Sequence, residues 1–110
     1  MSEFVDYLTE VFEPFGKIHS RRMFGGHGIY HDGLMFGLVA DDQLYLKADA
    51  DSVGYFHHHE LPAFEYDKNG KLMKMSYFLA PESIFDDTEE AITWARRAYD
   101  AALRARSRKR

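Results

Sequence analysis

Histidine side chains in the middle of the chain are the first residues whose spacing suggests metal chemistry. His57, His58 and His59 are consecutive. On a helix their side chains would point about 100° apart, so they cannot converge on one ion. A helical metal site places its histidines at positions i and i+4 instead. We therefore expect a solvated helix end at this run and no metal site.

A spacing typical of calcium loops begins at Asp49. Asp49, Asp51 and Gly54 stand at the first, third and sixth positions of an EF-hand loop, but the fifth position is Val53, which has no side-chain oxygen. The residues before Asp49 also have a strand pattern, whereas an EF-hand needs a helix there. We therefore expect Asp49 or Asp51 to cap a short helix over residues 51–59, and we expect no cofactor.

Nucleophilic catalysis has no support in the sequence. Cysteine is absent, and no serine lies in a nucleophile elbow. His31 and Asp32 are neighbours, but Asp32 is needed by a tight turn. The acid pairs at 41–42 and 86–87 match a turn and a helix start, where acids serve the backbone. The sequence predicts a protein that is not an enzyme and has no catalytic residues.

Basic and aromatic residues lie together in the segment that begins at Arg21. Arg21 and Arg22 precede Phe24, but the order differs from the basic-Gly-aromatic-Gly pattern of an RNA-recognition strand. Phosphate binding needs a positive surface, yet residues 1–95 contain seventeen acids and seven bases, for a charge of −10. The last fifteen residues carry +6. Direct nucleic-acid binding by Arg21, Arg22 and this basic tip is therefore the alternative function, and arginines paired with local acids are the simpler interpretation.

Length and composition indicate one folded domain. The chain has 110 residues, of which 45% are hydrophobic, and we expect a single domain over residues 1–106 followed by a disordered basic tail at 107–110. No apolar run approaches the roughly 20 residues of a membrane span. The first residues include acids where a signal peptide has bases. We therefore expect a cytoplasmic protein that does not bind membranes.

Local patterns predict an α+β fold with an antiparallel sheet. Apolar spacing predicts a helix over residues 3–13, and a capping pattern predicts a long final helix from about Asp87. Between the helices, Asp32-Gly33 and Asn69-Gly70 are strong two-residue hairpin turns, and Asp41-Asp42 is a weaker one. Strands joined by tight hairpins form antiparallel sheets. The expected architecture is an antiparallel sheet with an N-terminal helix, a short middle helix and a long C-terminal helix.

The hairpin turns also predict which residues share a sheet face. Two-residue loops pair Ile29 with Phe36 and Leu38 with Tyr45, on a face that is too apolar to be left to water. That face needs a helix or another chain over it. An unidentified protein partner, or a second copy in a homodimer, would supply such a cover. The candidate interaction surface combines this face with the basic-aromatic segment: Arg21, Arg22, Phe24, Phe36, Leu38 and Tyr45.

The order of these motifs resembles one known family, the TfoX N-terminal-domain family of regulators of competence-specific genes. The resemblance covers about residues 3–105. It is carried by Arg22-Met23-Phe24-Gly25-Gly26-x-Gly28-x-Tyr30, then Gly33 and Phe36, then Asp42-x-Leu44-Tyr45-Leu46-Lys47-x-Asp49, Pro62-x-Phe64-x-Tyr66, Met75-Ser76-Tyr77 and Trp94-x-x-x-Ala98-x-x-Ala101.

The resemblance implies both a fold and a function. It implies an antiparallel α+β domain of a secretion-chaperone-like type, often dimeric, without catalytic residues or cofactors. Full-length competence regulators of this family add a C-terminal helical domain, and the present chain matches the first domain. The expected function is therefore that of a non-enzymatic regulator of transcription or competence that acts through protein–protein contacts.

Overall fold

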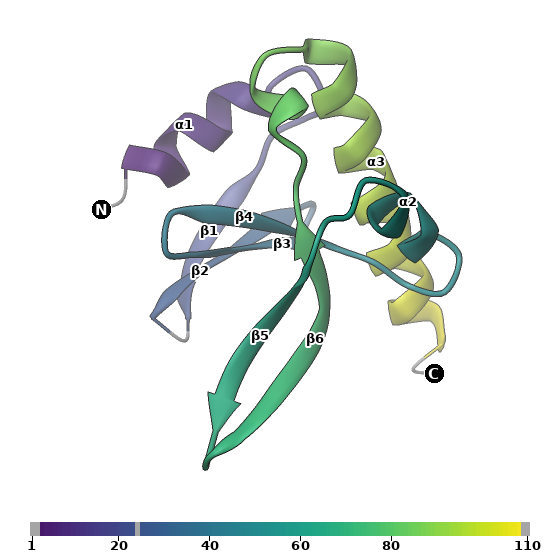
Figure 1. The fold of residues 1–110 in the computed structure, drawn as a ribbon. Helices are drawn as coiled ribbons and strands as arrows, with labels where there is room; N and C mark the ends of the chain where they lie inside the picture. The colour runs from purple at the N-terminus through teal and green to yellow at the C-terminus, as the bar shows by residue number, and fades with distance from the viewer. Residues whose placement is uncertain (1–2, 24, 109–110) are drawn as a thin grey trace.

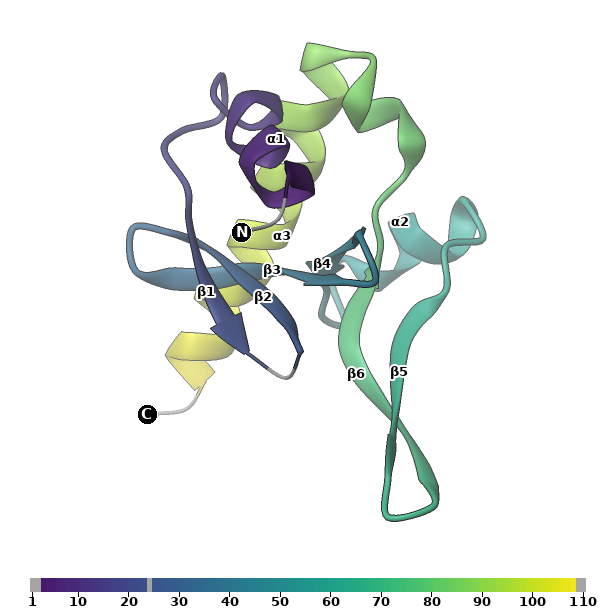
Figure 2. The same cartoon turned by 90° about the vertical axis from the view of Figure 1, so that its left-hand side faces the viewer.

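A computed structural model describes residues 3–23 and 25–108 and has the expected α+β architecture. One antiparallel sheet contains six strands in the order β1-β2-β3-β4-β6-β5. Helices α1 and α3 cover one face of this sheet, and the β5–β6 hairpin projects beyond the rest of the molecule (Figures 1 and 2). The elements are α1 (Glu3–Val11), β1 (His19–Met23), β2 (Gly26–His31), β3 (Leu34–Ala40), β4 (Gln43–Lys47), α2 (Val53–His58), β5 (Ala63–Lys68), β6 (Lys71–Leu79), the 3₁₀ turn η1 (Glu82–Phe85) and α3 (Thr88–Arg108).

All three predicted hairpin turns are confirmed. Both central residues have positive φ in each turn, as type I′ geometry requires. The φ angles are 50° and 78° in the β2–β3 turn, 52° and 56° in the β3–β4 turn, and 55° and 78° in the β5–β6 turn. The middle turn consists of Asp41 and Asp42 and has no glycine. Aspartate tolerates positive φ because its short polar side chain can hydrogen-bond locally.

The predicted strand register is correct on one side of β3 and wrong on the other. Leu38 pairs with Tyr45 as expected. On the β2 side, however, Ile29 pairs with Gly37 and not with Phe36, because the register shifts between Ile29 and Tyr30. Such a β-bulge inserts one unpaired residue into a strand and interrupts its alternation. The extra residue is Phe36, so a side chain assigned to one face by simple alternation belongs to the other.

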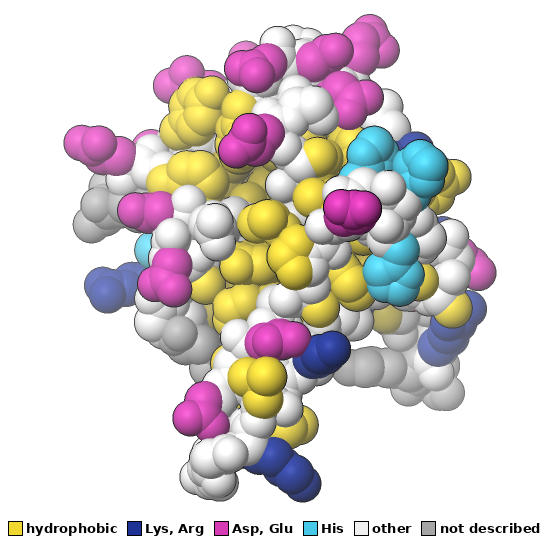
Figure 3. Space-filling model, viewed as in Figure 1, with side chains coloured by type: hydrophobic (Ala, Val, Ile, Leu, Met, Phe, Trp, Pro, Cys, Tyr) yellow, Lys and Arg dark blue, Asp and Glu magenta, His cyan; other side chains and the backbone are white. Residues whose placement is uncertain are grey.

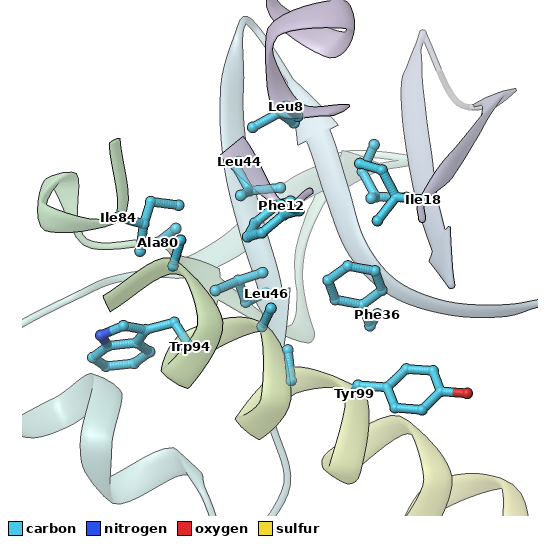
Figure 4. Packing of buried hydrophobic residues seen from close by; sticks show 14 of the residues in the cluster. Leu8, Phe12, Ile18, Phe36, Leu44, Leu46, Ala80, Ile84, Trp94 and Tyr99 are labelled. Carbon is cyan, nitrogen blue, oxygen red and sulfur yellow. The ribbon is translucent and has the colours of Figure 1, made fainter. Parts of the chain in front are cut away.

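The hydrophobic core fills the space between the helices and one face of the sheet. Figure 4 shows Phe12, from the segment after α1, and Tyr99 of α3 on opposite sides of Phe36 of β3. The ring centroids of Phe12 and Tyr99 lie 5.9 and 6.3 Å from that of Phe36. Leu44 and Leu46 of β4 point into the same cluster. We call this covered side the inner face of the sheet and the opposite side the outer face.

The start of α3 follows the predicted capping residue, whereas the N-cap position of α2 is Ser52, without a side-chain capping hydrogen bond, and not Asp49 or Asp51. The Asp87 carboxylate accepts hydrogen bonds from the backbone N–H of Glu89 at 2.9 Å and of Glu90 at 3.4 Å, and so caps α3. The Asp49 carboxylate accepts from the backbone N–H of Asp51 and Ser52, each at 3.1 Å, in the turn before α2. At the other end, α3 continues to Arg108, two residues beyond the expected end of the folded domain at residue 106.

An ion pair holds the C-terminal part of α3 against the turn before α2. The Arg104 guanidinium donates to both carboxylate oxygens of Asp49, at 2.6 and 3.0 Å, and lies 3.4 Å from Asp51. Only 11% of the Asp49 side chain is exposed. The hydrogen bond from Arg104 lowers the pKa of Asp49 to about 2, against the opposing effect of burial.

This ion pair predicts an acid-sensitive part of the stability. A carboxyl whose pKa falls on folding stabilises the native state above its unfolded pKa of 3.8, and this contribution disappears as the pH falls towards 2. Asp49→Asn should therefore lower the free energy of unfolding by about 2 kcal/mol at pH 7 and by little at pH 2. Urea unfolding at both pH values measures the difference. Asp51→Asn, at a carboxylate that is 61% exposed, is the matched control and should change stability by less than about 1 kcal/mol.

Candidate interaction site

The arginines of the predicted interaction surface lie on an edge strand. Arg21 and Arg22 are both exposed on β1, which pairs only with β2 among the described strands. Arg21 pairs with Gly28, and its guanidinium lies 5.6 Å from the ring centroid of Tyr30 on the outer face. Because successive strand residues point to opposite faces, Arg22 lies on the other side of β1. Phe24, the next predicted residue, lies outside the described residues.

The apolar members of the predicted surface separate onto the two faces of the sheet. Phe36 is fully buried on the inner face, so its assignment to an interaction surface is corrected by the bulge that turns it towards the helices. Leu38 and Tyr45 pair with each other on the outer face. Leu38 is also buried, but it is not part of the core cluster between sheet and helices. The inner face is thus covered by the chain's own helices.

An apolar groove of about 410 Å³ crosses the outer face. We call it the outer groove; most of its lining is apolar and comes from five strands, β1, β2, β3, β5 and β6. Figure 3 shows hydrophobic side chains gathered across the middle of the molecule above the β5–β6 hairpin, with charged side chains around them. The lining residues are Met23, Gly26, Leu38, Val39, Ala40, Phe64, Tyr66, Asp67 and Met75.

Curvature of the sheet creates this groove. Met23 is on β1 and Tyr66 is on β5, the two edge strands of the sheet, with four strands between them. Both nevertheless line the same groove, so the sheet curls over its outer face. The β1–β2 and β5–β6 hairpins project in the same direction (Figures 1 and 2). Tyr45 closes one side of this surface, with its ring centroid 5.0 Å from that of Phe64.

Two tyrosines of the outer face, Tyr45 and Tyr77, have raised pKa values. Burial, together with a smaller effect of the nearby Tyr30, raises the pKa of Tyr77 to about 12. Burial, followed by the charge of Asp41, raises the pKa of Tyr45, whose hydroxyl donates to the Gln43 side chain at 3.1 Å. Neither phenol is therefore suited to act as a base near neutral pH. The face offers aromatic and apolar contact area with few titratable groups.

The histidines that first suggested chemistry do not converge. The rings of His57 and His59 contact Phe78 and Trp94, at centroid distances of 5.7 and 5.6 Å. Figure 3 shows histidine side chains on the surface beside α2. Within residues 3–23 and 25–108, no group of three or more His, Cys, Asp or Glu side chains is arranged to hold a metal ion.

His31 has a structural position. Its Nδ1 lies 2.7 Å from the carbonyl oxygen of Lys17, which can only accept, so this nitrogen is the donor. The imidazole also packs between the rings of Phe15 and Tyr99, at centroid distances of 4.8 and 5.0 Å. These contacts fasten the end of β2 to the segment between α1 and β1.

Sequence reasoning missed most of the groove lining on the β5–β6 hairpin. The Asn69-Gly70 turn sets a register in which Tyr66 pairs with Met73 and Glu65 with Lys74. That register placed Phe64, Tyr66 and Met75 on one apolar face, which was the available signal. What the pattern could not supply was the position of this face opposite Met23.

In the described part of the chain, no helix has the length and hydrophobicity needed to span a membrane.

Comparison with known proteins identifies the family. A family model described as the TfoX N-terminal domain matches residues 10–102, which include the whole sheet and most of α3. Protein Sxy from Escherichia coli strain K12 is 29% identical over 98 residues, covering 89% of this chain and 47% of Sxy. DNA transformation protein TfoX1 from Aliivibrio fischeri is 27% identical over 78 residues, covering 71% of this chain and 37% of TfoX1.

In both relatives, this chain matches only part of the protein. The chain spans about half the length of Sxy, or less in the case of TfoX1, with 47% and 37% of these relatives covered. The family match over residues 10–102 covers the outer groove and the inner core except for the core residues of α1. From the model match over residues 10–102, the chain belongs to the TfoX N-terminal domain family.

Proposed function

We propose that this chain is a non-enzymatic regulatory domain that controls competence genes by binding another protein through the outer groove. The observation that carries the proposal is the groove itself: an apolar hollow of about 410 Å³ between the two edge strands, with Phe64 and Tyr66 in its lining. Large apolar surfaces left open to water are typical of interaction sites. The printed name of TfoX1, a DNA transformation protein, supports the biological role.

The side chains of the groove favour binding over catalysis. Asp67 is its one titratable lining residue besides Tyr66. General acid–base catalysis needs a positioned pair of groups or one poised near the working pH, and a single rim carboxylate supplies neither. Aromatic and methionine side chains, by contrast, are enriched at protein interfaces. A homodimer stays a prediction under this proposal, with sedimentation equilibrium as its measurement.

A chimera with TfoX1 tests the proposal. The segment of A. fischeri TfoX1 that matches this chain is replaced by the chain, and the frequency of DNA transformation is measured in cells that lack the native gene. We expect the chimera to restore transformation. Met75→Glu should then reduce the frequency at least about tenfold, because a charge in the centre of an apolar interface costs about 1.4 kcal/mol or more.

Leu72→Glu provides the matched control for this chimera. Leu72 is 64% exposed on the same hairpin and points away from the groove, because its position in β6 alternates with that of Met75. Its substitution should leave the frequency within about twofold. A wild-type chimera that restores no transformation contradicts the competence role. Equal effects of Met75→Glu and Leu72→Glu contradict the groove as the contact surface.

A further inference from the structure

The β1 edge is a basic strand on an otherwise acidic body. Its five residues, His-Ser-Arg-Arg-Met, contain no acid, whereas residues 1–95 together carry −10. Among the residues that the structure describes, no carboxylate forms an ion pair with Arg21 or Arg22. The simpler sequence interpretation, arginines paired with local acids, is therefore wrong within the described part of the chain. The Arg21 guanidinium lies over the Tyr30 ring, but no described carboxylate neutralises either arginine, so both positive charges can attract a partner.

This basic strand is also a free sheet edge. One side of β1 pairs with β2, and no described strand pairs with the other side. A free edge presents unpaired N–H and C=O groups that an added strand can bind. Exposed charged side chains can prevent an edge strand from pairing with other strands, but they repel only strands that carry charge of the same sign. Two arginines protect β1 against basic strands and attract acidic ones.

The positions of the two arginines favour a strand over a nucleic acid. Arg21 and Arg22 point to opposite faces of β1, so a phosphate backbone lying along one face meets only one of them. A strand added edge-to-edge has side chains on both faces, and consecutive acids in it would meet both arginines. Met23, which follows them, lines the outer groove and requires an apolar neighbour.

We propose that the β1 edge binds an extended acidic segment of a partner protein as a seventh strand, with an apolar side chain beside Met23 and two acids beside Arg22 and Arg21. In antiparallel pairing the partner sequence reads apolar-acid-acid. This inference rests on the proposed function, because it specifies the partner of the surface that includes the outer groove. It adds a chemical class of partner and a binding mode.

Nuclear magnetic resonance on the full chain tests the binding mode. The probe is a capped hexapeptide, Thr-Val-Glu-Glu-Val-Thr, titrated to millimolar concentration into ¹⁵N-labelled protein. We expect saturable shifts of the β1 amide signals. A peptide with lysines in place of the glutamates should bind about three- to tenfold more weakly, given the size of two cross-strand charge pairs. The double variant Arg21→Glu/Arg22→Glu should reverse this preference, and Arg21→Lys/Arg22→Lys should keep it.

Backbone methylation separates strand pairing from simple charge attraction. Two further peptides carry N-methyl groups on alternate residues, in the two complementary patterns. Because only one edge of the peptide can face β1, one pattern should abolish binding and the other should preserve it. Equal binding by both patterns, no shift at β1, or no charge preference overturns the proposal. So does a single-stranded oligonucleotide that displaces the peptide from the same amides at lower concentration.

The transformation assay distinguishes failure of this inference from failure of the proposed function. If Met75→Glu reduces transformation in the chimera but Arg21→Glu/Arg22→Glu leaves it within twofold, the groove is the contact and the edge inference is overturned. We expect both variants to reduce it at least about tenfold. Both arginines are exposed, so the double variant is expected to fold, and its thermal melting curve checks this.

Discussion

Gly26→Ala is expected to lower the free energy of unfolding by about 3 kcal/mol or more. A Cβ on Gly26 would overlap the carbonyl oxygen of Val39 and would lie 3.1 Å from the carbonyl carbon and 3.5 Å from the Cα of Ala40. All three atoms belong to the backbone, so no side chain can rotate away to make room. The strands β2 and β3 would have to separate. Urea unfolding followed by circular dichroism measures the loss.

A second glycine provides the control for this prediction. Gly54 lies in α2 with no atom within 4 Å of its Cβ position. Alanine there should stabilise the protein by about 0.5–1 kcal/mol, because glycine in a helix carries an entropic cost. A loss of less than 1 kcal/mol for Gly26→Ala would contradict the close approach of the two strands. Gly26 also lines the outer groove, so this approach shapes the floor of the interaction site.

Phe36→Ala is expected to lower the free energy of unfolding by about 3–5 kcal/mol, in the range for removing a fully buried aromatic ring. Phe36 has no exposed surface and contacts Phe12, Phe15 and Tyr99 with ring-centroid distances between 5.6 and 6.3 Å. These contacts connect β3 to α3 and to the segment that follows α1. For a domain of this size, the melting temperature should fall by roughly 4–8 °C per kcal/mol.

Tyr45→Ala makes the corresponding change on the outer face. Tyr45 is partly exposed and contacts Phe64, so its removal should cost about 1 kcal/mol or less. Strict alternation predicts Phe36 and Tyr45 on the same face of the sheet, but the bulge in β3 puts Phe36 on the inner face. If both variants lost the same stability, the assignment of Phe36 to the inner face would be contradicted. Combined with the chimera, Tyr45→Ala also measures binding without a large loss of stability.

Local physical chemistry determined the elements of this fold. Aspartate and asparagine before glycine, and a pair of aspartates, fixed three hairpin turns because few residues tolerate positive φ. Those turns set the order of antiparallel strands, and helical apolar spacing set the two helices that cover them. The family could also be identified from sequence, since its motifs extend along the chain in a fixed order.

The composition of the candidate site depended on tertiary structure. Strict alternation predicts that Phe36 and Leu38 share an uncovered face of the sheet. The extra residue in β3 instead puts Phe36 on the inner face and leaves Leu38 on the outer face. Such a bulge depends on how β2, β3 and the covering helices fit together, so a two-residue periodicity cannot reveal it. The sequence identified Arg21 and Arg22 as candidate residues. Only the positions of the acids in the structure show that no described carboxylate forms an ion pair with them.

Short-range patterns predicted the hairpins, the α+β class and the cap of α3, because each depends on residues close together in the chain, and the order of motifs along the chain indicated the family. Which apolar face is covered, and the fact that Met23 and Tyr66 on opposite edge strands line one groove, follow from the tertiary structure. Twist and curl accumulate over six strands, each adding a rotation set by its neighbours. The separation of the edge strands β1 and β5 therefore depends on the geometry of all six strands, and no single segment of the sequence determines it.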